Sequence, residues 1–326
     1  MLASPILVPP PAPPAMHIPD GFLSVGVSIV FWALSAMVIA YALKRVNRDL
    51  GERQAPMMGV LAACIFAGQM LNFSVAGGTS GHLLGAAIAT ILLGPWAAIL
   101  VLTCVVGVQA LIFQDGGLLA RGANIFNMAI VGVVVSYFVY RTIYRLAGSK
   151  PWGIFAAGFA AGWSSIFIAA LACGLQLALS GTSPANVSIP TMGGIHTLIG
   201  AGEGLITVGA LAFLFSTRRD LITAGQAQPA RSRWVWVAGL VIALGLAVAS
   251  PLASSHPDGL EWVAEQKGCL DAAQAPLYKV IPDYIFPGVS NSALATILAG
   301  VVGALIVFGV ALGVAWSRRD RQPAAR

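Results

Sequence analysis

Long apolar runs recur along almost the whole chain, and they restrict the possible folds more than any other feature. Each run is long enough to cross the roughly 30 Å hydrocarbon core of a bilayer as one helix, and the clearest of them cover residues 22–43, 56–74, 154–180, 195–216, 234–252 and 295–316. Charged residues make up only 9% of the chain, against about 25% in ordinary soluble domains. The pattern predicts an all-α, polytopic membrane protein.

The apolar run over residues 83–113 is too long for one crossing. As a single helix it would measure about 46 Å at about 1.5 Å per residue, and Gly94-Pro95 interrupts it near the middle. We therefore predict a short helix that ends near residue 93 and a second helix over 96–113. With a further helix over 124–141, the count becomes nine: a core of seven crossings and a C-terminal tail of two.

The positions of Lys and Arg predict how these helices are oriented. With the N-terminus outside, every Lys and Arg except Arg121, Lys267 and Lys279 falls on the cytoplasmic side, as the positive-inside rule requires. An unbroken helix over 83–113 would move the basic cluster at 141–150 to the outside. The net charge of +6 therefore reflects topology and not nucleic-acid binding. We expect a multi-pass protein of the bacterial inner (plasma) membrane, in contact with lipid.

Composition divides the chain into four parts. Residues 1–15 hold six prolines and no Lys or Arg, so they lack the basic region of a secretory signal and form a proline-rich extension. Residues 16–216 form the membrane core, and the polar, basic residues 217–233 form a cytoplasmic linker. Residues 234–326 form a two-helix domain, with an outer loop over 253–294 that carries several acidic residues.

Met16 and His17 can form a metal chelate if Met16 is the true N-terminus. A free Met16 amine, the deprotonated amide nitrogen of His17 and its imidazole Nδ1 would close adjoining five- and six-membered rings around one ion. Pro19 has no amide hydrogen, so backbone chelation cannot extend to that residue. One planar position remains, and His82 is the candidate for it. Such an all-nitrogen square favours Ni(II) or Cu(II) over Zn, Mg or Ca.

The extension before Met16 bears directly on this chelate. If residues 1–15 are retained, the Met16 nitrogen is a peptide amide and one donor is lost. Translation therefore starts at Met16, or the extension is cleaved, or the site uses another donor. Each histidine also has a purely structural interpretation. His17 would then be a polar residue at the entrance of a helix. His82, which we expect to open the short third helix, would be hydrogen-bonded to a carbonyl group.

Further polar residues lie close to the expected site or within a span. Asn72, Gln109 and Asp115 sit near the outer ends of their helices and are candidates to hold the ligands in place, because metal-bound imidazoles usually donate their second N–H to such groups. Hydrogen bonding between helices explains them equally well. His196 and Glu203 share one helix face. They are weaker candidates, because they can satisfy each other and a carboxylate suits a nitrogen square poorly.

Several motifs resemble the substrate-binding membrane component of the energy-coupling-factor cobalt and nickel importers. The resemblance runs in order through MHIPDG at 16–21, GGTSGHLLG at 77–85, GPW at 94–96, QALIFQDGG at 109–117, GAN at 122–124 and HTLIGAGE at 196–203. Residues 257–261 (PDGLE) are similar to the small C-terminal subunit or domain of these importers. The resemblance implies capture of Ni(II) or Co(II) as cargo, without a resident cofactor. It also implies two partners, a coupling transmembrane subunit and ABC-type ATPase subunits.

Two other function classes remain open at this point. An autonomous secondary transporter or channel would normally show inverted repeats or a chain of acids within the membrane. An intramembrane metalloenzyme could draw on His17, His82, His196 and Glu203, but no HExxH signature is present. The chain has no GxxxxGK[ST] phosphate loop, so energy for uphill uptake has to come from partners. The sequence leaves the choice between nickel and cobalt open.

Overall fold

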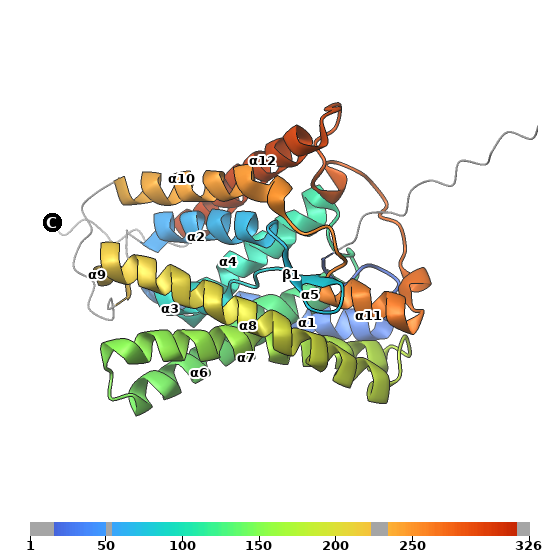
Figure 1. Ribbon diagram of the computed structural model, residues 1–326, viewed down its shortest axis with the longest axis horizontal. Coiled ribbons are helices and arrows are strands. Elements are labelled where there is room, and N and C mark those ends of the chain that lie inside the picture. Colours follow the sequence, from blue (N-terminus) through green and yellow to red (C-terminus); the bar gives the residue numbers. More distant parts are fainter. Residues whose placement is uncertain (1–15, 50–53, 223–233, 318–326) are drawn as a thin grey trace, which may run out of the picture.

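The protein is an elongated bundle of helices in the computed structural model, which describes residues 16–49, 54–222 and 234–317. Figure 1 shows most of the long helices running side by side along the longest axis. The predicted all-α, polytopic fold is confirmed. Its longer helices are α1 (Val25–Asp49), α2 (Gln54–Gln69), α4 (Pro95–Val108), α6 (Gly132–Leu146), α7 (Pro151–Leu179), α8 (Ala185–Thr217), α10 (Trp234–Ala249) and α12 (Ser292–Ser317).

Shorter elements complete the described parts of the chain. A small antiparallel hairpin, β1 (Phe73–Val75) and β2 (Thr79–Gly81), pairs Ser74 with Ser80. Two π-helical turns, η1 (Gln109–Phe113) and η2 (Phe126–Val131), continue neighbouring α-helices. The remaining elements are α3 (Ala86–Leu93), α5 (Arg121–Ile125), α9 (Arg219–Ile222), η4 (Ser250–Leu252), α11 (Gly259–Lys267), η5 (Leu270–Ala272) and η6 (Pro282–Tyr284).

Six helical stretches in the described residues are long and apolar enough to cross a membrane. They cover Val25–Val46, Pro95–Phe113, Arg121–Leu146, Pro151–Leu179, Ala185–Thr217 and Ser292–Ser317, and two shorter apolar helices cover Ala55–Gln69 and Trp236–Leu252. The remaining predicted crossing is α3, whose 8 residues measure about 12 Å and cannot cross a bilayer alone. The count of nine crossings stays a prediction.

The long apolar run breaks where the sequence predicted. Helix α3 ends at Leu93, Gly94 adopts a left-handed φ of 76°, and Pro95 opens α4. The start of α3 differs from the prediction, however. His82 does not open this helix, because residues 82–85 are not helical and Gly85, with φ 78°, precedes the first helical residue. His82 therefore lies on an irregular segment between the hairpin and α3.

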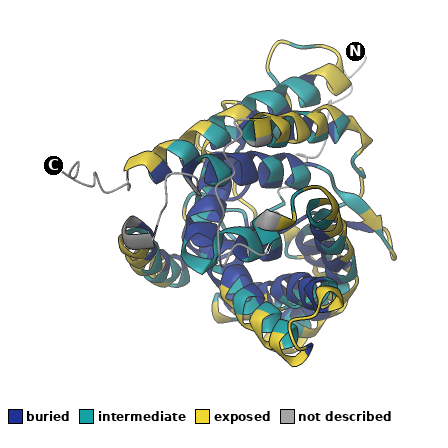
Figure 2. Ribbon diagram, turned by 90° about the vertical axis from the view of Figure 1, so that its left-hand side faces the viewer, coloured by how far each residue is buried: buried dark blue, intermediate teal, exposed yellow. Residues whose placement is uncertain are grey.

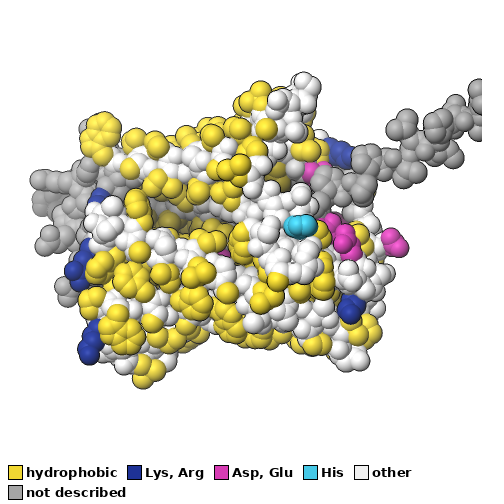
Figure 3. Space-filling view, viewed as in Figure 1, with side chains coloured by type: hydrophobic (Ala, Val, Ile, Leu, Met, Phe, Trp, Pro, Cys, Tyr) yellow, Lys and Arg dark blue, Asp and Glu magenta, His cyan; other side chains and the backbone are white. Residues whose placement is uncertain are grey.

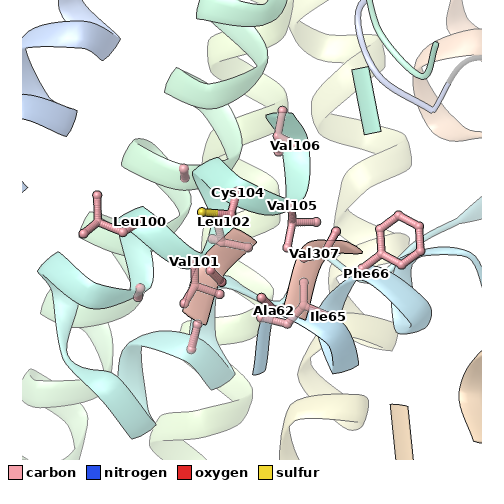
Figure 4. Packing of buried hydrophobic residues seen from close by; sticks show 14 of the residues in the cluster. Ala62, Ile65, Phe66, Leu100, Val101, Leu102, Cys104, Val105, Val106 and Val307 are labelled. Atoms are coloured by element: carbon pink, nitrogen blue, oxygen red, sulfur yellow. The ribbon is translucent and has the colours of Figure 1, made fainter. Parts of the chain in front are cut away.

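The C-terminal helices pack directly against the core. Helices α10 and α12 both lie along α2 (Figure 1). The contact is close because small residues face large ones: a Cβ on Gly303 would lie 2.2 Å from the Phe66 ring, and one on Gly239 would lie 2.4 Å from Val60. Figure 4 shows Val307 of α12 beside Phe66 of α2 and near residues of α4. The two-helix tail is therefore part of the bundle.

Burial and charge are arranged differently about the long axis: the centre of the bundle is buried, and charged side chains lie at its two ends (Figure 2 and Figure 3). Buried residues occupy the centre of the bundle in the end-on view of Figure 2. Large apolar side chains such as Leu205 and Phe138 are exposed, and hydrophobic side chains cover much of the face seen in Figure 3, as expected for helices that face lipid. Figure 3 shows one end, where α9 lies, with Lys and Arg, and the other end with most of the visible Asp and Glu together with some Lys or Arg. We call these the basic end and the acidic end. Their assignment to cytoplasm and exterior stays a prediction.

The predicted linker lies only in part within the described residues. Helix α8 runs to Thr217 and α9 covers Arg219–Ile222, while residues 223–233 fall outside the described ranges, as do residues 1–15. The predicted outer loop over 253–294 contains α11, and α12 begins within it at Ser292. At the acidic end, α11, the β1–β2 hairpin and the start of α1 lie close together (Figure 1).

Candidate metal centre

The segment that carries His17 is clamped between two polar side chains. Asn124 accepts a hydrogen bond from Ile18 N (3.0 Å) and donates one to Ile18 O (3.1 Å). Two residues further on, the Asp20 carboxylate accepts hydrogen bonds of 2.8–3.0 Å from the backbone N–H groups of Leu118, Leu119 and Ala120. The paired groups lie far apart in the sequence, so the helix packing brings them together.

Two consecutive glycines allow this close approach. A Cβ on Gly117 would lie 2.0 Å from Asp20 Oδ1, well inside van der Waals contact. A Cβ on Gly116 would lie 2.9 Å from His17 Cβ and 2.8 Å from Asn124 Nδ2, and its φ of 85° favours glycine in any case. The pair is therefore required for residues 17–20 to sit against residues 115–120.

His17 is almost completely buried against Asp115. Its backbone N–H donates to Asp115 Oδ1 (3.2 Å), and the same oxygen lies 3.0 Å from His17 Nδ1. Neither ring nitrogen has a partner in hydrogen-bond geometry. The predicted chelate would use these same two atoms of His17, the backbone nitrogen and Nδ1. Asp115 therefore contacts two of the proposed metal donors directly.

The His17–Asp115 pair shifts both pKa values. Burial lowers the pKa of His17, but the facing carboxylate outweighs burial and raises it above the ordinary value. Burial raises the pKa of Asp115, but His17 outweighs this effect and lowers it. Tyr284 also donates its hydroxyl to Asp115 Oδ2 at 2.6 Å, which favours the carboxylate. Both shifts therefore favour the ion pair when no metal is bound.

His82 lies beside His17. The two ring centroids are 5.6 Å apart and the rings are inclined at 74°. His82 Nδ1 lies 3.1 Å from Leu83 O. Because a carbonyl oxygen only accepts, this contact puts the hydrogen on Nδ1 and a lone pair on Nε2 in the neutral ring. Burial and the neighbouring His17 lower the pKa of His82, which keeps it neutral, as a metal ligand must be.

The irregular segment at 82–85 is held by buried polar side chains. Glu203 of α8 accepts hydrogen bonds from Leu84 N (2.7 Å) and Gly85 N (2.9 Å). The alternative that Glu203 and His196 satisfy each other is not what the structure has, because Glu203 bonds to two backbone donors and His196 to Met192 O. The physical role of Glu203 is to hold the chain next to His82.

Gln109 joins the two sides of the site through a chain of hydrogen bonds. Its Nε2 donates to Gln69 Oε1 (2.7 Å), and Gln69 Nε2 donates to Leu84 O (3.1 Å). The backbone carbonyl of Gln109 accepts from Asp115 N (3.1 Å). Gln109 and Gln69 together thus connect the backbone beside His82 to the backbone of Asp115, which faces His17.

Two predicted site residues do not bond to either histidine. His196 Nδ1 donates to Met192 O at 2.8 Å, one turn earlier on the same helix. The backbone carbonyl of Asn72 accepts from Ser254 N at 2.8 Å, and its buried side-chain Oδ1 has no hydrogen-bond partner. Within the described parts of the chain, no hydrogen bond joins Asn72 or His196 to His17 or His82.

The C-terminal domain contributes Asp258 to the site, which the sequence reasoning did not include. Residues 256–258 extend the hairpin: Ser80 N donates to Pro257 O (2.8 Å) and Ser80 Oγ donates to His256 O (2.8 Å). Asp258 Oδ1 caps α11 by accepting from Glu261 N (2.8 Å), and Oδ2 lies 4.0 Å from His82 Nε2. In the sequence, the PDGLE motif at 257–261 could have pointed to Asp258, and the GAN motif at 122–124 could have pointed to Asn124.

Side chains alone do not make a metal site in the described residues. Across residues 16–49, 54–222 and 234–317, no three His, Cys, Asp or Glu side chains are grouped closely enough to hold an ion. The predicted donor set differs, because two of its four nitrogens belong to the backbone of Met16 and His17. Met16 is partly buried at the edge of the described chain.

Comparisons with known proteins identify the family of this chain. The family described as "Cobalt uptake substrate-specific transmembrane region" (CbiM) matches residues 17–221, and the PDGLE domain family matches residues 233–320. The chain is 38% identical to the putative fused nickel transport protein NikMN of Archaeoglobus fulgidus, over 94% of this chain and 99% of that protein. It is 32% identical to the fused nickel transport protein NikMN of Rhodobacter capsulatus, over 91% and 96%.

A solved structure has the same fold over the core. It is described as a truncated transition metal transporter, and it is 35% identical with a TM-score of 0.56, covering 61% of this chain and 98% of that one. With six apolar helices in the described residues, the protein is a multi-pass membrane protein, consistent with the inner membrane. The chain belongs to the CbiM family of cobalt uptake substrate-specific transmembrane regions, and it carries a PDGLE domain at its C-terminal end.

Proposed function

We propose that the protein captures Ni(II) or Co(II) outside the cytoplasm and delivers the ion inward as the substrate-specific subunit of an ATP-driven energy-coupling-factor importer. One observation supports this proposal above all: the backbone N–H and the ring Nδ1 of buried His17 face one carboxylate, Asp115, and the His17 ring lies beside the ring of His82. Two nitrogens that can bind one metal ion are thus held together in a buried place next to a second imidazole.

The proposed donors are the Met16 amine, the His17 amide nitrogen and Nδ1, and His82 Nε2. Binding through the His17 amide nitrogen requires that its proton leave. Asp115 Oδ1 already accepts the hydrogen bond from this N–H at 3.2 Å, so it is the group placed to receive the proton. Metal binding would also displace the proton that the His17–Asp115 ion pair keeps on the imidazole.

The donor set and the names of the relatives decide which ion is tested first. A square of nitrogens favours Ni(II), and two relatives over most of the chain are named as nickel transport proteins. Relatives over the core alone include a cobalt transport protein CbiM of Sorangium cellulosum, 33% identical over 64% of this chain. Nickel is therefore the first ion to test and cobalt the second.

Transport requires partners in this proposal. The sequence contains no phosphate-binding loop for ATP, so a coupling transmembrane subunit and ABC-type ATPase subunits supply the energy. The core at 16–216 would bind the ion, the linker at 217–233 would lie in the cytoplasm, and the domain at 234–326 would close over the site from the outside. The gathering of basic side chains at one end of the bundle supports this orientation (Figure 3).

Native mass spectrometry of the full protein tests the donor set first. We expect a chain that begins at Met16 and carries one nickel or cobalt ion. A chain that keeps residues 1–15 and still binds metal would rule out the Met16 amine as a ligand. Uptake of radioactive nickel in cells with and without the partner ATPase then tests the coupling. Equal uptake in both strains would favour an autonomous transporter or channel.

A further inference from the structure

We propose that Tyr284, supplied by the PDGLE domain, is a positioning residue for the metal centre: its hydroxyl holds Asp115 in the orientation that keeps two donor atoms of His17 facing one point. This inference rests on the proposed function and extends it. It assigns the C-terminal domain a part in preparing the site for the ion, without any contact between Tyr284 and the ion.

The carboxylate of Asp115 uses its two oxygens for different partners. Oδ1 accepts from His17 N at 3.2 Å and lies 3.0 Å from His17 Nδ1, whereas Oδ2 accepts from the Tyr284 hydroxyl at 2.6 Å. A length of 2.6 Å is typical of a charge-assisted O–H···O⁻ bond, which is stronger than a neutral one. Because the terminal torsion of an aspartate side chain is broad, the bond at Oδ2 fixes the direction in which Oδ1 points.

The direction of Oδ1 matters because this one oxygen contacts both His17 atoms of the proposed chelate. Two donors that bind the same ion have to point at the same place, and the backbone nitrogen and Nδ1 of His17 already converge on Oδ1. Donors that are held in their binding geometry before the ion arrives lose less freedom on binding, which strengthens it. An Asp115 side chain that could rotate would give up this advantage.

The ring of Tyr284 is itself fixed by aromatic neighbours in the core. It stacks on Phe113 with ring centroids 4.7 Å apart and planes inclined at 13°, and its centroid lies 6.1 Å from that of Phe66. Phe113 is the last residue of η1 and precedes Asp115 by two positions. The stacked ring thus brings its hydroxyl to Asp115 from 169 residues away in the sequence.

Hydrogen bonds attach the segment before Tyr284 to the same end of η1. Ile281 N donates to Ile112 O at 2.9 Å. The hydroxyl of Tyr278 donates to Leu111 O at 3.0 Å. The last carbonyl groups of a helix have no partner within it, and here the outer loop of the PDGLE domain supplies partners for two of them. Tyr284 therefore reaches Asp115 from a segment that is anchored beside it.

The backbone at this contact adopts a costly conformation. Four residues other than glycine have a left-handed φ in the parts of the chain that the structure describes, and three of them lie here: Gln114 (56°), Asp283 (56°) and Tyr284 (58°). Such conformations persist where the surrounding contacts hold them, and they cluster at functional sites. The stacking on Phe113 and the bond to Asp115 are contacts that hold Tyr284.

A Tyr284→Phe variant tests this role in the full-length protein in detergent, because it removes the hydroxyl and keeps the stacked ring. Tyr278→Phe is the matched control, since it removes a hydroxyl of the same outer loop that bonds to Leu111 O and not to Asp115. We expect titration with NiCl₂ to show about tenfold weaker binding in Tyr284→Phe and no change in Tyr278→Phe. Unchanged affinity in Tyr284→Phe, or an equal loss in both variants, would overturn the proposal.

A double-mutant cycle separates the positioning of Asp115 from a general effect on packing. In Asp115→Ala there is no carboxylate for Tyr284 to hold, so adding Tyr284→Phe should change the Ni(II) affinity by less than about twofold. A role in packing alone would weaken binding by the same factor in both backgrounds, because the effects of independent interactions add. A further loss of about tenfold in the double variant would overturn the action through Asp115.

The variant His82→Ala separates this inference from the proposed function. Loss of binding in His82→Ala, combined with normal binding in Tyr284→Phe, would reject the role of Tyr284 and leave metal capture intact. Normal binding in both variants would reject the metal site itself, and this inference with it.

Discussion

Glu203 accepts hydrogen bonds from the backbone N–H groups of Leu84 and Gly85, and the bond to Gly85 is 2.9 Å long. Glu203 and Gly85 are 118 residues apart in the sequence. Through this contact, a buried carboxylate of a membrane helix supports the irregular segment that carries His82. Acidic residues inside a membrane bundle usually mark a functional site. Here Glu203 does not contact the proposed ligand His82 but bonds to the backbone of Leu84 and Gly85, which follow it in the chain.

Replacement of Glu203 by alanine should damage both binding and stability. Two buried N–H donors would lose their acceptor, at a cost of about 1–3 kcal/mol each. We expect a lower thermal unfolding temperature and weaker Ni(II) binding. His196→Ala is the control on the same helix, because the ring of His196 bonds to Met192 O one turn away. That variant should keep most of its binding, and a total loss there would mean that the proposed site lies at the wrong depth.

His82→Ala should abolish tight metal binding without unfolding the protein. The change removes one proposed donor from an irregular segment, while the hydrogen bonds of Leu84 and Gly85 to Glu203 remain. We expect at least about a hundredfold loss of Ni(II) affinity, or about 2.8 kcal/mol at about 1.4 kcal/mol per tenfold. Calorimetric titration measures the loss, and an unchanged dissociation constant would reject the four-nitrogen site.

Metal affinity should rise with pH in a way that depends on Asp115. The pKa of His17 is raised above its ordinary value of 6.5, so protons compete with the metal up to this raised pKa, and binding strengthens as pH rises through it. In Asp115→Asn the carboxylate that raises the pKa of His17 is gone, so metal affinity should increase with pH at a lower pH than in the unchanged protein. Dissociation constants measured from about pH 5.5 to 8.5 test this shift. Superimposable pH profiles for the two proteins would contradict the ion pair.

The stability of the metal-free protein should change with pH in the opposite direction. A raised pKa of His17 contributes stability that is fully present below its unfolded value and is lost as pH rises through the folded value. The lowered pKa of Asp115 contributes stability above its own unfolded value, which is lost as pH falls through the folded value. The ion pair is therefore most stabilising between these two limits. Thermal unfolding of chelator-treated protein across this range should show a decline at the alkaline side that Asp115→Asn lacks.

Gly117→Ala should disturb the clamp on the His17 segment. The new Cβ would lie 2.0 Å from Asp20 Oδ1 and 2.3 Å from Asp20 N, so the two segments would have to separate. We expect weaker metal binding and a lower unfolding temperature. Gly107→Ala is the matched control, since a Cβ there meets nothing within 4 Å and alanine favours the helix. Equal behaviour of the two variants would contradict the clamp.

Much of the fold could be predicted from the sequence, for a physical reason that acts locally. Hydrocarbon cannot hydrogen-bond to the backbone, so every crossing has to be a long apolar helix, and such runs are visible in the sequence. The break at Gly94-Pro95 was predictable because proline and glycine act on their own backbone. The start of α3 was not, because the backbone at 82–85 is held by Glu203 from a distant helix.

The sequence by itself determined the membrane fold and the residues most able to bind a metal, because apolar runs and the Met16-His17 pair act through neighbouring atoms. Only the tertiary structure decided what surrounds them. Gln69, Asn124 and Asp258 reach the site from separate parts of the chain, and Glu203 bonds to backbone, where the sequence offered a histidine partner as one alternative. Those contacts depend on how the helices pack, since packing determines which distant polar groups meet in a buried place where each has to find a partner.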